Sequence, residues 1–143
     1  MTTVQSIRQL IHDLALTERL CELAPDESRQ VVATAKELFV RGNPRSWWLS
    51  LKIPAQAVEY PDATGYLHLG DHLPGDGQRF WFVPELETAE LPVFDAELGA
   101  VAELLRESPF FEYYILTKDY RQLLIENDHN QVLLARRPGA ALA

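Results

Sequence analysis

Two groups of side chains have residue types that bind metals or transfer protons. The first is the run His68-Leu69-Gly70-Asp71-His72. On a helix, histidines four residues apart share a face, as in many metal sites. Gly70 and the turn that follows favour an extended chain instead, in which His68 and His72 lie about 13 Å apart. We therefore interpret both as surface or hydrogen-bonded histidines, and we expect no metal and no other cofactor.

The second group lies in the polar stretch 127–130, between two apolar segments. Glu126, Asp128 and His129 have the types of an acid/base set, because a carboxylate beside a histidine orients the ring and raises its pKa. Asn, Asp and His are also common turn residues, since they tolerate positive φ and bond to nearby backbone. We interpret the stretch as a turn. The alternative is a ligand-binding or catalytic site there, to which His68 or His72 would contribute.

Acidic residues are concentrated in one segment. The net charge is −8, and residues 85–112 contain eight acidic side chains against one arginine, a net of −7. An acidic surface repels phosphate backbones, so nucleic acid is not an expected ligand. It attracts basic proteins, and the predicted contacts are Glu97, Glu103 and Glu107. Trp47 is the predicted anchor, because tryptophan is enriched at binding hot spots. The alternative for the segment is a solubilising helix face.

Length and composition indicate one globular domain. The chain has 143 residues, of which 47% are hydrophobic and 24% charged. Cys21 is the single cysteine, so an internal disulfide is excluded and a reducing compartment is expected. No apolar run approaches the roughly 18 residues of a membrane-spanning helix. The first residues do not have the pattern of a signal peptide, and we expect a cytoplasmic protein that does not bind membranes.

Hydrophobic periodicity predicts the elements that position these side chains. Three helices are expected, at 3–24, from Asp26 to about residue 41, and from Asp95 to about Glu107; Asp26 and Asp95 are predicted helix caps. A short helical piece is expected at 45–49. An extended piece is expected at 57–60, and strands are expected at 65–69, 80–83, 111–118, 123–126 and 131–135.

This order predicts an α+β domain. We expect an antiparallel sheet of about five strands, with the N-terminal helices and one inserted helix packed on one face. Residues 1–143 would form a single domain, with a helical part at 1–44, a sheet-forming part at 45–137 and a frayed tail at 138–143.

The last strands also carry a resemblance to a known group of proteins. The segments FWF at 80–82, FFEYYILTKDY at 110–120 and LLIENDHNQVLL at 123–134 resemble a family of small bacterial proteins with an FEYY…LLxEN(H/D)H…VL pattern. The likeness covers roughly residues 45–135. The chain departs from the family at Gln122, where the pattern has an aromatic residue, and at Asp128, where it has histidine. The family carries no assigned activity, but some members look like immunity partners of secreted toxins.

These observations lead to two hypotheses about function. The first is a non-enzymatic bacterial binding protein, immunity- or antitoxin-like, whose acidic segment meets a basic protein partner. The alternative is an enzyme or small-ligand-binding protein with its site near the 127–130 turn. The sequence leaves open whether the chain is a monomer or a homodimer.

Overall fold

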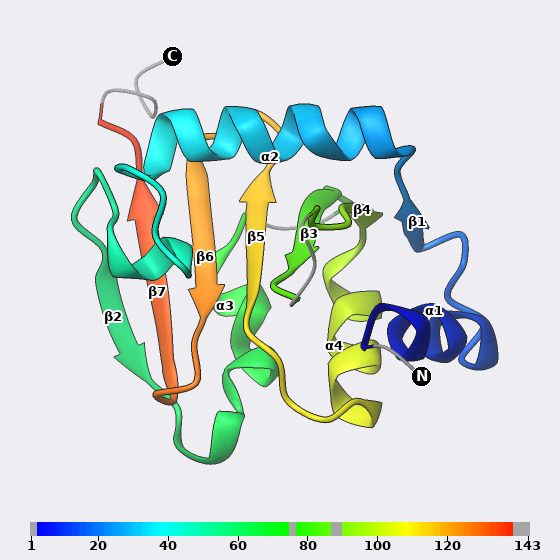
Figure 1. Cartoon of the computed structure of the whole chain (residues 1–143). Helices are drawn as coiled ribbons and strands as arrows, with labels where there is room; N and C mark the ends of the chain where they lie inside the picture. The colour runs from blue at the N-terminus through cyan, green and yellow to red at the C-terminus, as the bar shows by residue number, and fades with distance from the viewer. Residues whose placement is uncertain (1–2, 75–76, 87–89, 139–143) are drawn as a thin grey trace.

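The structure, a computed structural model, describes residues 3–74, 77–86 and 90–138. In this part of the chain, seven strands form one antiparallel sheet in the order β1-β4-β3-β5-β6-β7-β2 (Figure 1). The strands are β1 (Leu20–Glu22), β2 (Gln56–Glu59), β3 (Phe80–Pro84), β4 (Phe94–Ala96), β5 (Tyr113–Thr117), β6 (Gln122–Glu126) and β7 (Gln131–Arg136). The α+β class and the antiparallel sheet are confirmed, whereas the strand count is seven rather than five.

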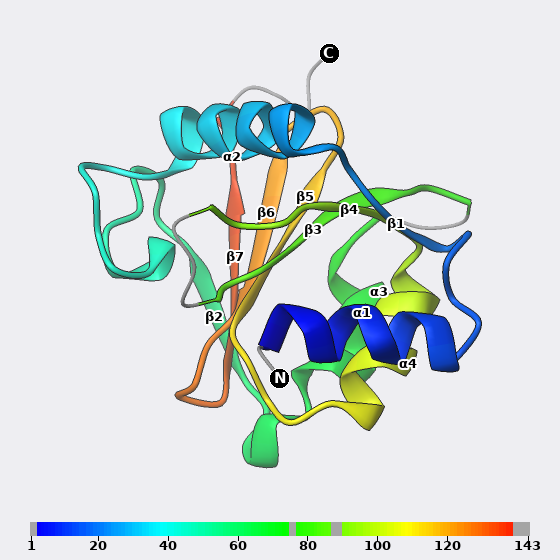
Figure 2. The ribbon, with the colours of Figure 1, turned by 45° about the vertical axis from the view of Figure 1, so that its right-hand side comes forward.

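Helices cover both faces of this sheet, so the prediction of a single covered face is wrong. The α-helices are α1 (Thr3–Asp13), α2 (Pro25–Phe39), α3 (Leu69–His72) and α4 (Leu98–Glu107), and the 3-10 helices are η1 (Trp47–Leu49), η2 (Pro61–Ala63) and η3 (Gly65–His68). Figure 2 shows α2 on one side of the sheet and α1, α3 and α4 on the other. The reason lies in β5, which is buried at all five of its positions and therefore needs cover on both faces.

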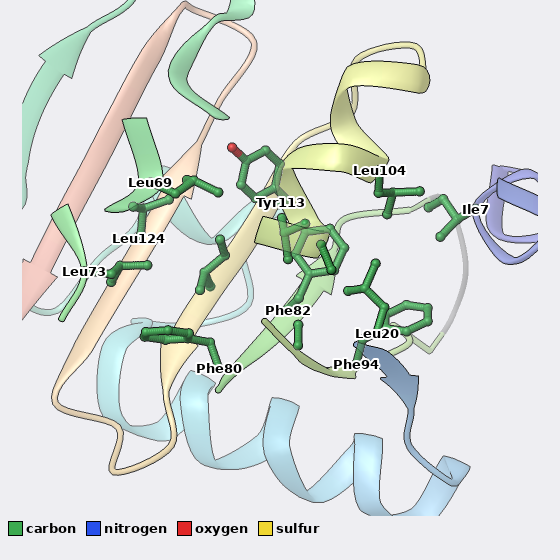
Figure 3. Close-up of a cluster of buried hydrophobic side chains, with 14 of the residues drawn as sticks. Ile7, Leu20, Leu69, Leu73, Phe80, Phe82, Phe94, Leu104, Tyr113 and Leu124 are labelled. Atoms are coloured by element: carbon green, nitrogen blue, oxygen red, sulfur yellow. The ribbon is translucent and has the colours of Figure 1, made fainter. Parts of the chain in front are cut away.

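Alternate residues of β5 pack into two separate hydrophobic cores. Tyr113 and Ile115 belong to the core under α1 and α4, together with Phe82 (Figure 3). Tyr114 and Leu116 belong to the core under α2. This alternation is the normal consequence of strand geometry. Each large side chain buried in this way contributes about 1.5–3 kcal/mol of transfer free energy.

Two short strands, β1 and β4, lie outside the predicted ones. Residues 20–22 continue an apolar helical pattern, and Asp95 looks like a helix cap, yet β1 and β4 pair with each other in the sheet. The Asp95 carboxylate instead accepts a 2.7 Å hydrogen bond from Arg79. The helix that Asp95 was expected to cap begins at Leu98. A three-residue strand has little local signal, because its state depends on the partner strand.

Other local predictions also needed correction. Segment 65–69 is helical, not a strand, since it forms η3 and enters α3. The first helix ends at Asp13, and Ala15 then adopts a φ of 56° that turns the chain. Helix α2 begins at Pro25, a favoured first helical position, and Asp26 pairs with Arg29 instead of capping. The short helical piece at 45–49 is confirmed by η1.

Strand register brings distant polar residues together at one end of the sheet. Tyr113 of β5 lies opposite Glu126 of β6 and opposite Pro84 of β3. Just beyond this row, the Glu85 amide donates to the Glu112 carbonyl oxygen at 2.9 Å. Among the described residues, no helix is long and apolar enough to span a bilayer. Of the predicted tail, residues 139–143 lie outside the described part of the chain.

Candidate functional site

The polar stretch 127–130 is a turn between β6 and β7, as predicted. Asn127 is fully buried, and its side-chain oxygen accepts hydrogen bonds from the amides of His129 and Gln131 at 3.0 and 3.2 Å. Asn130 takes a φ of 61°, which asparagine tolerates better than most residues. The polar side chains therefore have a structural role within the turn itself.

The same turn also supports two carboxyl sites on opposite faces of the sheet. The Asp128 amide donates to Glu112 at 2.9 Å, on the α2 face. On the other face, the Asn130 side-chain oxygen accepts from the Ala63 amide at 3.0 Å. The Asn130 carbonyl oxygen accepts from the Tyr60 amide at 2.8 Å. The Asp128 amide thus donates to the carboxylate of one site, and Asn130 holds the 60–63 backbone beside the other site.

The first site is a buried carboxyl, Glu126, at the end of β6. Its side chain lies on the α4 face because residues alternate along the strand, and the residue is 1% exposed. The Tyr113 hydroxyl donates to Oε1 at 2.5 Å, and the Gly65 amide donates to Oε2 at 2.9 Å. Three separate segments of the chain therefore meet at one carboxyl group.

Glycine is required at position 65 by this arrangement. A Cβ atom there would lie 2.6 Å from Cγ2 of Val132 and 2.7 Å from Oε2 of Glu126. Any larger residue would push η3 away from β6 and β7. The close approach of the Gly65 backbone is what lets its amide reach the Glu126 carboxylate.

Burial and hydrogen bonding act on Glu126 in opposite directions. Burial raises its pKa, while the Tyr113 hydroxyl and the backbone amides of Gly65 and Tyr66 lower it again in part. Burial beside this carboxylate also raises the pKa of Tyr113 well above its usual range. Among the described residues, no Lys, Arg or His side chain forms an ion pair with Glu126. Within the described part of the chain, the carboxyl thus has hydrogen-bond donors but no positive counterion.

Glu126 lines an open pocket of about 230 Å³, which we call the Glu126 pocket. Its lining combines aromatic, acidic and hydroxyl side chains with one arginine. The lining residues are Asp62, Ala63, Tyr66, Leu105, Arg106, Ser108, Phe110, Tyr113 and Glu126. They come from η2, η3, α4, the α4–β5 connection, β5 and β6. The pocket is therefore a product of tertiary structure.

The second site, the Glu112 cluster, lies on the α2 face and consists of Ser46, Trp48, Glu85, Glu112 and Tyr114. Oε2 of Glu112 accepts from the Trp48 indole at 3.1 Å, and Oε1 accepts from the Ser46 hydroxyl at 3.3 Å. The Tyr114 hydroxyl donates to Glu85 at 2.7 Å. Two carboxyl groups from adjacent strand ends thus share one half-buried network.

This network raises the pKa of Glu112 to about 7. Burial is the main cause; the Asp128 amide lowers the pKa, and the neighbouring Glu85 carboxyl raises it further. A carboxyl group of this pKa has the strength of a general acid or base near neutral pH. Both oxygens of Glu112 are already bonded to donors inside the protein, however. The geometry thus favours a role in joining segments 46–48, 85 and 127–130.

His68 and His72 pack around Tyr60 and do not join either carboxyl site. The Tyr60 hydroxyl lies 2.6 Å from Nε2 of His72, and the His68 ring stacks on Tyr60 with a centroid distance of 4.4 Å. The rings of His129 and Trp48 meet edge to face, with a centroid distance of 5.3 Å. In the described part of the chain, no group of three or more His, Cys, Asp or Glu residues is placed to hold a metal ion.

Within the described residues, four acidic side chains of this segment form ion pairs with basic residues from elsewhere in the chain: Glu90, Asp95, Glu97 and Glu103. Arg19 binds both Glu97 and Glu103, at 2.9 and 3.1 Å. Glu107 is exposed at the end of α4. Trp47 is 4% exposed and stacks on Tyr114 at a centroid distance of 4.1 Å, so it is not an exposed anchor. A count of charges along the sequence misses these long-range pairs.

Comparison with known protein families, with curated proteins and with solved structures finds no match for this chain. The site is therefore interpreted from its own geometry. Of the predicted site residues, the structure places Glu126 in the pocket and Asp128 beside the Glu112 cluster. Sequence reasoning missed Gly65, Glu112 and Tyr113. The sequence feature that could have identified Glu112 is its position as a charged residue among the aromatic residues of a predicted strand.

Proposed function

We propose that this protein is a non-enzymatic protein-binding module that docks a basic partner on the surface around the Glu126 pocket. The observation that carries the proposal is an exposed aromatic residue at a pocket with a buried carboxyl. Phe110 lines the pocket and is 44% exposed, while Glu126 in the same pocket is 1% exposed. Aromatic residues beside pockets are typical binding hot spots.

Further exposed apolar and acidic residues line this pocket or follow its lining residues in sequence. Leu67 follows the lining residue Tyr66 and is 59% exposed. Asp62 lines the pocket and is exposed, and exposed Glu107 follows Arg106 in α4. Combined with the net charge of −8, these groups favour a basic partner, because complementary charge speeds encounter and rejects acidic proteins.

The partner is basic, as the sequence predicts, but it binds the surface around the Glu126 pocket and not the acidic segment as a whole. Arg19 pairs with both Glu97 and Glu103 and offsets one of their two negative charges, so they are weaker candidates for steering. Glu107 remains part of the proposed surface. An immunity- or antitoxin-like role in a bacterium agrees with the resemblance of the 110–134 segment and with an acidic surface that covers a basic site.

A peptide-display selection against the immobilised full chain tests this function. Selected peptides should be rich in Lys and Arg, and a Leu67→Ser/Phe110→Ser variant should bind them at least ~10-fold more weakly, since a truncated hot spot costs more than about 1.4 kcal/mol. Leu49→Ser is the matched control, because Leu49 is 47% exposed but lies in η1.

Three outcomes would contradict the proposal. These are a selection that yields no binding peptides, binding that is equally weakened by Leu49→Ser, and selected peptides without basic residues. Circular dichroism of each variant shows whether the fold is retained. A small molecule that competes for the wild-type pocket, in the absence of any peptide binding, would favour the alternative of a small-ligand-binding protein.

A further inference from the structure

We infer that the Glu126 pocket binds the ammonium group of one lysine side chain, which the partner inserts beside Phe110. This inference rests on the proposed function and names the group that is recognised.

The charge balance of the pocket favours a cation. Glu126 is almost fully buried, and its donors are one hydroxyl and two backbone amides, all neutral groups. A buried carboxylate is strongly disfavoured unless it takes up a proton or is paired with a positive group. An inserted cation would supply the pairing that the described residues lack.

The size of the pocket favours a single side chain. Its volume is about 230 Å³, below the roughly 300–1,000 Å³ of pockets that enclose drug-sized ligands. A lysine side chain is narrow, and its methylene stem can lie against apolar walls while its charged end reaches further. Phe110 and Leu105 line the pocket and provide such walls.

The free acceptors match an ammonium better than a guanidinium. A carboxylate has about four acceptor positions, and Glu126 uses three of them for Tyr113, Gly65 and Tyr66. One position is left, which excludes the two-bond contact that arginine prefers with a carboxylate. The Ser108 hydroxyl, which donates to the Pro109 carbonyl oxygen at 2.9 Å, keeps its own acceptor positions, and Asp62 adds a second carboxylate.

The aromatic residues of the pocket favour a bound cation, whereas its arginine opposes one. Tyr66 and Phe110 line the pocket, and the negative face of an aromatic ring attracts an ammonium group. Arg106 lines the same pocket and is exposed. Its positive charge opposes a bound cation, so removal of this charge should tighten binding.

A nuclear magnetic resonance titration of the ¹⁵N-labelled full chain tests the inference. The probe is N-acetyl-L-lysine methylamide, with the norleucine analogue as the uncharged control and the arginine analogue as the guanidinium comparison. The lysine probe should give saturable shifts of the Gly65 and Tyr66 amide signals. Its affinity should be about tenfold or more above that of the norleucine probe, and above that of the arginine probe.

Three variants define the site. Glu126→Gln should weaken lysine binding by about tenfold or more, and Arg106→Gln should strengthen it by about two- to fivefold. If Glu126→Gln does not fold, Asp62→Asn keeps the test decisive. Asp62 is exposed, and its loss should weaken binding by about two- to fivefold.

Equal binding of the lysine and norleucine probes would overturn the inference, as would unchanged affinity in Glu126→Gln or, where that variant does not fold, in Asp62→Asn. Stronger binding of the arginine probe would also overturn it. These failures are distinct from a failure of the proposed function. Selected peptides that depend on Leu67 and Phe110 but not on Glu126 would retain the docking surface and reject the lysine site.

Discussion

Tyr113 and Glu126 lie directly opposite each other on β5 and β6, and the Tyr113 hydroxyl donates a 2.5 Å hydrogen bond to Oε1 of Glu126. The residue before Tyr113 is Glu112, whose side chain lies on the other face of the sheet and bonds Trp48. One pair of strand ends thus holds a carboxyl group on each face. The turn from Asn127 to Asn130 supports both of them.

Loss of the Tyr113 hydroxyl should destabilise the fold. Tyr113→Phe leaves a buried carboxyl with one donor fewer, and an unsatisfied buried group costs about 1–3 kcal/mol. The free energy of unfolding in urea measures this loss. Tyr66→Phe is the control, since Tyr66 lines the same pocket and is only half-buried. In a double-mutant cycle, Tyr113→Phe should cost less in a Glu126→Gln background. Equal costs in both backgrounds would show that the two groups are not coupled.

A methyl group at position 65 should also be destabilising. Gly65→Ala places Cβ within 2.7 Å of the Glu126 carboxylate and closer still to Val132, and such overpacking costs about 1–3 kcal/mol. Gly70→Ala is the matched control, because nothing lies within 4 Å of a Cβ there. Since Gly70 lies within α3, that change should be neutral or stabilising by up to about 1 kcal/mol. Equal thermal unfolding midpoints for the two variants would contradict the close approach at Gly65.

The Glu112 cluster should make stability depend on pH. Folding raises the pKa of Glu112 from its ordinary 4.5 to about 7, so the folded state binds the proton more tightly than the unfolded chain. The contribution of Glu112 to stability is then fully present below about pH 4.5 and is lost as the pH rises through about 7. The expected loss is about 1–2 kcal/mol, because partial exposure reduces the full linkage value of 1.4 kcal/mol per pKa unit.

Glu112→Gln should flatten this pH dependence, as measured by urea unfolding at about pH 5 and about pH 8. Trp48 fluorescence should follow the same transition, since the indole donates to Glu112. His129→Asn is the control, because it removes the imidazole that contacts Trp48 and leaves the carboxyl pair intact. If His129→Asn removes the pH dependence and Glu112→Gln retains it, the assignment to Glu112 is wrong.

Two substitutions at Asn130 separate its backbone role from its side-chain role. Asn130→Gly keeps the positive φ but loses the bond to the Ala63 amide, whereas Asn130→Ala loses both. Each lost contribution is about 1 kcal/mol, so the alanine variant should have the lower unfolding free energy. Both variants should also shift the Gly65 amide resonance, because the 61–64 segment leads into η3. A glycine variant no more stable than the alanine variant would contradict the backbone role.

Sequence patterns are sufficient to predict the helices and strands whose local signal is strong. The meander of β5, β6 and β7 alternates clearly and is joined by short polar turns, so it was predicted within a few residues. Helix α2 and strand β3 were likewise predicted. In each case a long apolar face or a continuous apolar run makes the element recognisable from the sequence alone.

The sequence by itself determined the class of the domain, the polar turn and the concentration of acidic residues between 85 and 112. Only the tertiary structure decided which of those charges are free. Arg19 pairs with Glu97 and Glu103 across 78 and 84 residues of sequence, and Gly65 approaches Glu126 across 61 residues. Hydrophobic periodicity is a local property, whereas a buried carboxyl and its donors are set by strand register and close packing. The candidate site therefore lies where distant segments meet.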